Sequence, residues 1–162
     1  MVKGVLVLGL VCCAAVAGAE WPTYHGGAGL RGVSDAALPE KPERLWRFNA
    51  GGVVYNTPVS DGARIFFSTK KGEVVALDLA GSNLWKKSMV RTNDAGGAVP
   101  VRFEAPLVCG GGLVFAGSTR GTLYALDAKT GELRWKYETD GRIVGSPNFV
   151  GFDREVAKSL RN

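Results

Sequence analysis

The sequence predicts an all-β fold built from four-stranded antiparallel units, and three observations support this fold class. Residues 57–85 and 105–135 align with each other and need only two single-residue gaps. Glycine is abundant, at 23 of 162 residues, and supplies the positive-φ positions that hairpins need. Long helical periodicities are few, so the chain is expected to consist of short strands and turns.

The first 19 residues predict a secretory signal peptide. Lys3 precedes an apolar run over 5–16, and small residues fill positions 17–19, the pattern of a cleavage site. The apolar run is shorter than the roughly 20 residues that a membrane-spanning helix needs. We therefore expect cleavage after Ala19, a secreted or periplasmic mature chain, and no transmembrane segment or lipid anchor.

A lead segment follows over residues 20–43, and the repeat units are expected over 44–151. Trp21 is expected to pack the lead segment onto the sheets that follow it. The stretch RLWRF, residues 44–48, predicts an isolated strand, the outermost of a unit whose three other strands are not in this chain.

Each of the two aligned copies predicts four strands. The first surrounds a proline, the second is RIFFST or LVFAGS, the third is EVVALD or TLYALD, and the fourth ends at Trp85 or Trp135. Gly72 and Gly121 occupy hairpin corners. Alternation along TLYALD sends apolar side chains to both faces, as expected for a sheet that is covered on both sides.

The spacing of the tryptophans predicts how the copies are arranged. Trp46, Trp85 and Trp135 lie 39 and 50 positions apart, which brackets the roughly 40 to 50 residues of a four-stranded propeller blade. The longer interval contains an insertion, RTNDAGGAVPVRFE (91–104). It is expected to form a loop near the central face of the propeller, as either a spacer or a ligand site.

The repeat pattern breaks near the end of the chain. A third copy begins at RIVGSPNFVG (142–151), but the charged stretch 152–162 that follows has a helix-like pattern. Three explanations remain open: a truncated or frame-shifted reading of a longer gene, a short protein with a helical tail, or a piece that assembles with others. We expect a fragment of a longer protein, because open blades expose apolar surface and strand edges.

The stretch ALDAKTGELRW (125–135) resembles the tryptophan-docking repeat of the quinoprotein-like (PQQ-like) β-propellers of secreted bacterial proteins. This resemblance implies a partial β-propeller in which each tryptophan packs against a neighbouring blade, while aspartate and threonine hold the turn. The structural repeat motif comprises Trp46, Ala76, Asp78, Gly81, Trp85, Ala125, Asp127, Thr130, Gly131 and Trp135.

The same family includes dehydrogenases that bind pyrroloquinoline quinone (PQQ) and calcium. The resemblance implies an adjacent cysteine pair beneath that cofactor, and the only pair here, Cys12-Cys13, lies in the expected signal. Asp94 and Glu104 in the insertion are the remaining candidates for calcium. We expect no cofactor and no metal in this chain, and PQQ with calcium only if it belongs to a dehydrogenase.

Other catalytic and binding sites are hard to assemble from these residues. His25 is the only histidine, so a zinc site with paired histidines is excluded, and a catalytic triad would have to use the lead segment. Residues 110–112 (Gly-Gly-Gly) predict a hairpin turn, and Cys109 a buried thiol. The basic residues are scattered along the chain, so nucleic acid is not expected as a partner.

The sequence therefore favours a non-enzymatic extracytoplasmic binding or scaffold module, since no complete catalytic constellation is present. Its expected partner is another protein or further blades. The alternative is the N-terminal part of a PQQ-dependent quinoprotein dehydrogenase.

Overall fold

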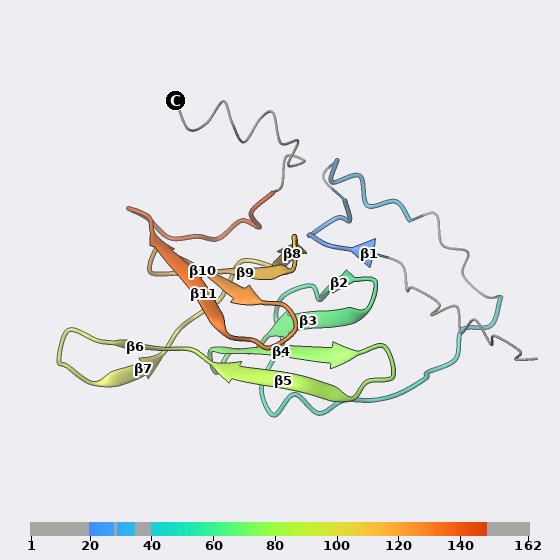
Figure 1. Cartoon of the computed structure of the whole chain (residues 1–162), viewed down its shortest axis with the longest axis horizontal. Coiled ribbons are helices and arrows are strands. Elements are labelled where there is room, and N and C mark those ends of the chain that lie inside the picture. The colour runs from blue at the N-terminus through green and yellow to red at the C-terminus, as the bar shows by residue number, and fades with distance from the viewer. Residues whose placement is uncertain (1–19, 28, 35–39, 149–162) are drawn as a thin grey trace, which may run out of the picture.

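The computed structural model describes residues 20–27, 29–34 and 40–148. These residues form two antiparallel β-sheets that lie against each other as blades, and a two-stranded hairpin projects beside them (Figure 1). The expected signal peptide and the charged tail lie outside the described residues. Among the described residues, no helix has the length and hydropathy needed to cross a membrane.

The first blade corresponds to the first sequence copy. Its strands are β2 (Val59–Asp61), β3 (Arg64–Ser68), β4 (Glu73–Asp78) and β5 (Asn83–Ser88), each hydrogen-bonded to the next. The expected strand order is correct, but the fourth strand does not end at its tryptophan. Trp85 lies in the middle of β5, because the pairing with β4 continues as far as Ser88.

The second blade repeats this arrangement. Its strands are β8 (Val108–Gly110), β9 (Leu113–Gly117), β10 (Thr122–Asp127) and β11 (Leu133–Glu138). The glycine run forms the expected hairpin turn between β8 and β9. Gly111 and Gly112 have φ values of 59° and 78°, as in the tight turns that match the twist of paired strands.

The lead segment adds a fifth strand to the first blade. Strand β1 (Glu20–Trp21) pairs antiparallel with β2, so that Trp21 lies opposite Ser60. Just beyond it, the carbonyl oxygen of Pro22 accepts a hydrogen bond of 2.8 Å from the backbone N–H of Cys109. The lead segment therefore links the innermost strands of both blades.

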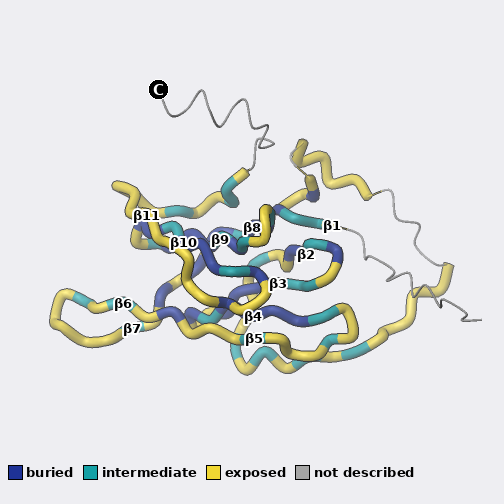
Figure 2. The backbone as a smooth tube through the Cα atoms, in the orientation of Figure 1, coloured by how far each residue is buried: buried dark blue, intermediate teal, exposed yellow. Residues whose placement is uncertain are grey.

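The core lies mainly between the blades, where the tube in Figure 2 is darkest. Alternate residues of the central strands supply it: Phe66, Val74 and Ala76 from the first blade, and Val114, Tyr124 and Leu126 from the second. The other residues of the first blade, Phe67, Val75 and Leu77, form a second cluster on its opposite face. Both faces of this first blade are thus covered. In the second blade, for which the TLYALD stretch predicts two covered faces, the outer strand of the sheet is exposed along its length.

The expected strand at RLWRF (44–48) is wrong. The segment has no regular secondary structure, and Leu45 is 87% exposed. Its apolar side chains Trp46 and Phe48 nevertheless pack on the second cluster of the first blade. A β-strand is defined by hydrogen bonds to a neighbouring strand, and here the contact with the blade is made by side chains instead.

The insertion is also different from the expected loop. It contains a hairpin of β6 (Val90–Thr92) and β7 (Ala98–Pro100), which form a separate two-stranded sheet. Figure 1 shows this hairpin reaching out beyond the ends of β4 and β5. Turn-forming residues at its tip allow the two arms of the insertion to pair with each other.

Candidate functional site

The interface between the two blades is organised by Trp85. Its indole Nε1–H donates a hydrogen bond of 3.1 Å to the carbonyl oxygen of Ala128 in the second blade. The ring lies against Gly131, where an added Cβ would come within 2.6 Å of the indole. The indole of one blade therefore seats on the turn of the next, and the absence of a side chain at Gly131 makes room for it.

Trp46 makes an equivalent contact with the β4–β5 turn of the first blade. Its Nε1–H donates a hydrogen bond of 2.9 Å to the carbonyl oxygen of Leu79, which corresponds in the alignment to Ala128. An added Cβ on Gly81 would come within 2.5 Å of its ring. Two successive tryptophans thus dock on equivalent turns, although Trp46 does so from a segment that is not a strand.

The turn that receives Trp85 is held by Asp127. One of its carboxylate oxygens accepts hydrogen bonds from the backbone N–H groups of Lys129 and Thr130, at 2.8 and 3.0 Å, and the other accepts one of 2.8 Å from Arg134. The Arg134 guanidinium and these N–H groups hold the pKa of the Asp127 carboxyl well below its usual range. The Thr130 hydroxyl accepts a further hydrogen bond from the N–H of Glu132, at 3.3 Å.

The equivalent turn of the first blade is held more simply. Asp78 accepts a single side-chain hydrogen bond, of 2.8 Å, from the backbone N–H of Ser82. In both blades the alanine of the motif lies directly across the sheet from the tryptophan: Ala76 pairs with Trp85 and Ala125 with Trp135. Both alanines are fully buried. The motif therefore places a small side chain opposite each tryptophan in the sheet.

Trp135 is in a different environment from the other two tryptophans of the motif. Its ring packs beside Phe115 of its own blade at a centroid distance of 5.7 Å, yet the residue is 43% exposed. Leu133 and Tyr137 on the same strand are also exposed, at 44% and 64%. The outer strand of the second blade therefore presents an uncovered apolar surface.

The other residues considered as catalytic or metal-binding candidates do not form a common site among the described residues. Cys109 is buried on β8, and burial raises the pKa of its thiol to about 12, so the thiol stays neutral and unreactive. His25 is exposed in the lead segment. Glu104 is paired with Arg142 at 2.7 Å, whereas Asp94 lies in the turn that joins β6 to β7.

The fit to PQQ and calcium can be tested on these residues. The cysteine pair that the resemblance implies is not available among the described residues, where Cys109 is a single buried thiol. Within the described part of the chain, no three acidic, histidine or cysteine side chains gather closely enough to hold a metal ion. The described residues therefore do not fit this cofactor.

The β6–β7 hairpin is fixed at its base by the first blade. The N–H of Met89 donates to the carbonyl oxygen of Gly72 at 2.8 Å, and the N–H of Val101 donates to the carbonyl oxygen of Met89 at 2.9 Å. Gly72 has a φ of 79°, and an added Cβ would lie 2.5 Å from the carbonyl oxygen of Val101. This close approach requires glycine and holds both arms of the hairpin against the β3–β4 turn.

The tip of the hairpin is closed by Asn93. Its side-chain oxygen accepts hydrogen bonds from the backbone N–H groups of Gly97 and Ala95, at 2.7 and 3.1 Å. Its own N–H donates to the carbonyl oxygen of Gly97 at 2.8 Å. The insertion thus has a defined shape at both ends.

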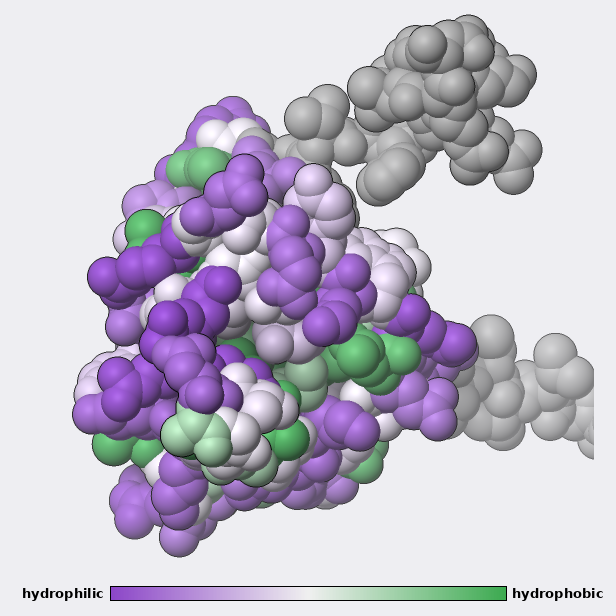
Figure 3. Space-filling model, turned by 90° about the vertical axis from the view of Figure 1, so that its left-hand side faces the viewer, coloured by the Kyte–Doolittle hydropathy of each residue, from purple (hydrophilic) through white to green (hydrophobic). Residues whose placement is uncertain are grey.

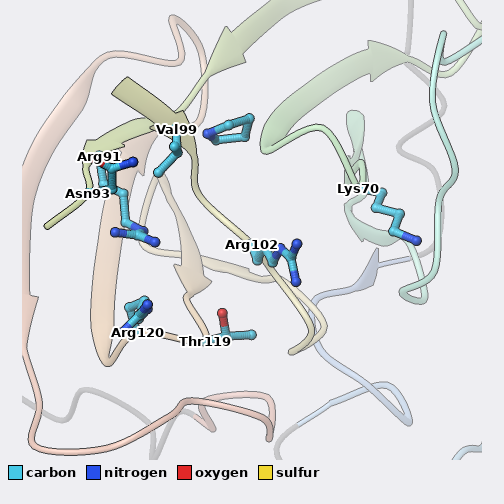
Figure 4. Close-up of a pocket in the computed structure, with 8 residues that line it drawn as sticks. Lys70, Arg91, Asn93, Val99, Arg102, Thr119 and Arg120 are labelled. Carbon is cyan, nitrogen blue, oxygen red and sulfur yellow. The ribbon is translucent and has the colours of Figure 1, made fainter. Parts of the chain in front are cut away.

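A pocket opens where the hairpin meets the turns of both blades (Figure 4). It has a volume of about 570 Å³. The first blade contributes Lys70 from its β3–β4 turn, and the second contributes Arg120 from its β9–β10 turn. The lining of this hairpin pocket consists of Lys70, Arg91, Asn93, Val99, Pro100, Arg102, Thr119 and Arg120.

The hairpin pocket is strongly cationic. Among the described residues, its lining includes no acidic residue and four cations: Lys70, Arg91, Arg102 and Arg120. Within the described part of the chain, five ion pairs form elsewhere, and none includes any of these four side chains. The arrangement concentrates positive potential in one opening and can therefore attract an anion.

Sequence reasoning missed this pocket because its cations are far apart in the chain. A signal was nevertheless present. Lys70 and Arg120 lie within two residues of the equivalent glycines, Gly72 and Gly121, and Arg91 and Arg102 lie at or near the two ends of the insertion. The alignment puts Lys70 and Arg120 in equivalent turns of the two copies, so both could have been expected at the same end of the sheets.

Comparison with known proteins supports the propeller assignment. A family model described as "Outer membrane protein assembly factor BamB", of the PQQ-like repeat type, matches residues 70–157. The outer membrane protein assembly factor BamB of Moranella endobia (strain PCIT) is 28% identical over 116 residues, or 66% of this chain. A lanthanide-dependent methanol dehydrogenase from Methylacidiphilum fumariolicum (strain SolV) is 37% identical over 54 residues, covering 33% of this chain and 9% of that protein.

A solved structure shows the same fold. A europium-containing methanol dehydrogenase aligns over 82% of this chain and 26% of its own, with a TM-score of 0.64 and 22% sequence identity. The chain spans 30% of the length of the M. endobia protein. The repeated tryptophan docking, the two antiparallel blades and the family match agree, and the chain belongs to the PQQ-like β-propeller repeat family whose model is described as outer membrane protein assembly factor BamB.

Proposed function

We propose that this chain is a non-enzymatic, extracytoplasmic binding or scaffold module that recognises a protein partner. The observation that carries the proposal is the β6–β7 hairpin, which projects from a rigid pair of blades and presents an opening with four cations that have no ion-pair partner among the described residues. Several similar proteins are named outer membrane protein assembly factors. An assembly role is consistent with a projecting hairpin and a cationic opening that a partner could contact.

Specific contacts hold the hairpin in place on the two blades. The hydrogen bond from Met89 to Gly72 fixes the hairpin to the first blade, and docking of Trp85 on Gly131 fixes that blade to the second. A projecting element that is held in place before binding loses little conformational entropy when a partner arrives. The face around Trp135 offers a second contact surface, which we assign to a further blade of the same repeat type.

The location belongs to the same proposal. The expected signal peptide over 1–19 would deliver the mature chain to the periplasm or beyond. Expression with the natural N-terminus, followed by cell fractionation and N-terminal sequencing, should give extracytoplasmic protein that begins at Glu20. Protein that stays in the cytoplasm with Met1 at its N-terminus would contradict this location.

Photo-crosslinking tests the binding role. A photoreactive amino acid at Ala95, on the exposed hairpin tip, is expected to capture a discrete protein partner in cells. The same group at Lys129, which is exposed on the β10–β11 turn, serves as the control and should not capture that partner. Equal capture from both positions, or none from Ala95, would count against a binding role for the hairpin.

The alternative function is that of a PQQ-dependent dehydrogenase segment, and its support is the similarity to a methanol dehydrogenase over 54 residues. Titration of the purified, folded chain with PQQ and calcium discriminates between the two functions. Under the scaffold proposal, the absorbance of the cofactor stays unchanged. A saturable change in that absorbance would favour the dehydrogenase instead.

A further inference from the structure

No ion pair within the described part of the chain balances the charge of the hairpin pocket. The acidic side chains of the neighbouring strands are already engaged: Glu73 pairs with Lys86 at 2.8 Å, and Glu138 pairs with Lys136 at 3.1 Å. The side chain of Lys86 holds the pKa of Glu73 below its ordinary value, so this carboxylate stays ionised and committed to its own pair. The four cations that line the pocket are therefore available to an external anion.

We propose that the hairpin pocket binds the carboxylate groups of an extended acidic peptide segment on a protein partner. This inference rests on the proposed binding function, and it names the chemistry that the partner presents. The segment would lie across the opening between the β6–β7 hairpin and the turn that carries Arg120, with its acidic side chains directed at the four cations.

The distribution of the cations favours a chain of charges over a single anion. They come from four different segments: the β3–β4 turn, strand β6, the stretch before β8, and the β9–β10 turn. Figure 4 shows Arg91 and Arg120 on one side of the opening, Arg102 near its middle and Lys70 on the far side. Charges spread in this way match a segment with several carboxylates.

The rest of the lining also suits a peptide. Val99 and Pro100 supply apolar contacts, and Asn93 and Thr119 supply polar ones. In the described structure, β6 and β7 pair only with each other, so each also has an outer edge that can hydrogen-bond to an extended backbone. Figure 3 faces the side on which the hairpin projects, and hydrophilic residues dominate that surface, as a charged partner requires.

Nucleic acid is a poorer fit than peptide. Proteins that bind single strands stack the bases on aromatic rings, and none of the described residues that line the hairpin pocket is aromatic. The ammonium of Lys70 lies 5.3 Å from the ring centroid of Tyr55, which is not among the residues that line the pocket. The pocket therefore offers charge and hydrogen bonds without a stacking platform.

Binding of a labelled hexaglutamate peptide to the full chain tests this inference. Fluorescence anisotropy should show saturable binding that weakens as salt is raised, because the contacts are mainly electrostatic. The double variant Arg102→Glu, Arg120→Glu is expected to weaken binding by about tenfold or more. Circular dichroism checks that it is folded, and the milder Arg102→Gln, Arg120→Gln pair should weaken binding in the same direction.

The matched control changes the net charge equally at another place. Arg44→Glu, Lys87→Glu alters two exposed cations that lie outside the pocket, and binding should stay within about twofold of the unmodified chain. Equal losses in the pocket variant and the control would overturn the proposal, since the peptide would then sense only the net charge. Binding of a phosphorylated oligonucleotide in preference to hexaglutamate would overturn it as well.

The two proposals fail in different ways. If the hairpin tip captures a protein in cells but hexaglutamate does not bind, the pocket inference is wrong and the binding role stands. If hexaglutamate binds through Arg102 and Arg120 but no protein is captured, the proposed scaffold role is wrong while the anion site remains.

Discussion

At the scale of single residues, the interface between the blades depends on a few side chains with well-defined tasks. Asp127 holds the turn on which Trp85 rests, and Gly131 leaves the space that the indole fills. Each indole brings a large apolar area out of water and keeps its N–H hydrogen-bonded. Small changes at these positions should therefore have effects that reach across the interface.

Asp127→Asn should destabilise the chain at neutral pH and remove part of its acid sensitivity. The pKa of Asp127 is lowered in the fold, mainly by the hydrogen bond from Arg134. A lowered carboxyl pKa makes the free energy of unfolding depend on pH. The stabilisation that the Asp127 carboxylate provides is complete above about pH 4 and is lost as the pH falls through the lowered pKa. Thermal unfolding followed by circular dichroism between pH 2 and 7 measures this effect.

The control for that experiment is Asp94→Asn, on the exposed turn of the hairpin. It removes one acidic group without touching the blade interface, so its melting temperature should follow the unmodified chain at every pH. An Asp127→Asn variant that keeps the full acid-induced loss of stability would show that the turn carboxylate is not its source.

Gly131→Ala should unseat Trp85 from the second blade. The new Cβ would lie 2.6 Å from the indole ring, and the residue has a φ of 72°. We expect a loss of about 2 kcal/mol or more in the free energy of unfolding, because a clash is added to backbone strain. Urea denaturation measures the loss, and a red shift in tryptophan fluorescence would report the displaced ring.

Gly111→Ala separates the two causes. Gly111 also has a positive φ, of 59°, but nothing lies within 4 Å of an added Cβ. This variant should lose only about 1 kcal/mol, from backbone strain alone. Equal losses in the two variants would mean that contact with Trp85 adds nothing.

At the scale of elements, the hairpin of β6 and β7 stands apart from the two blades. It is a two-stranded sheet, which is marginally stable by itself, and hydrogen bonds at both its ends compensate for this. Gly72 and Val101 belong to the base, and Asn93 closes the tip. Because Figure 2 shows the hairpin as largely exposed, its shape depends more on these bonds than on burial.

Asn93→Ala should loosen the hairpin without unfolding the blades. The change removes the oxygen that accepts hydrogen bonds from Gly97 and Ala95, and each such bond contributes about 1 kcal/mol. Amide hydrogen exchange in β6 and β7 should become roughly fivefold faster or more, with β4 and β10 unchanged.

A matched change at another turn tests whether that effect is local. Asn49→Ala removes a similar side-chain bond of 2.9 Å to the N–H of Gly51, and the exchange of hairpin amides should then stay at its normal rate. Faster exchange throughout the Asn93→Ala variant would show that the hairpin is coupled to global stability.

At the scale of the whole molecule, the two blades form an asymmetric unit. On one side, residues 46–50 cover the first blade through Trp46 and Phe48. On the other side, Leu133, Trp135 and Tyr137 of the second blade are exposed. The described part of the propeller therefore has one covered face and one open face, and the open face carries the tryptophan that would dock on the next blade.

This asymmetry predicts unequal effects for two equivalent substitutions. Trp85→Ala should cost about 2–3 kcal/mol in the free energy of unfolding, because it removes an indole that is packed between the blades. Trp135→Ala, a matched change on the open face, should cost about 1 kcal/mol or less. Urea denaturation of both variants makes the comparison, and similar losses would contradict the assignment of an open face at Trp135.

Much of this architecture could be predicted from the sequence because it is encoded locally. Each strand of the two blades lies within a short stretch whose alternation and flanking glycines specify it, as in TLYALD between Gly121 and Gly131. The equivalence of the copies followed from the same local signals, and so did the turn at residues 110–112. Periodicity and turn chemistry act over a few residues, so the sequence determined the blades by itself.

Only the tertiary structure decided how the remaining segments are used. Whether RLWRF becomes a strand depends on a partner strand elsewhere, and here its side chains pack on the blade without one. The cations of the hairpin pocket are separated by up to 50 positions in the chain, from Lys70 to Arg120, and the folded turns and insertion bring them to one opening. Pairing and charge clustering are contacts between distant residues, so their outcome is set by the packing of the whole fold.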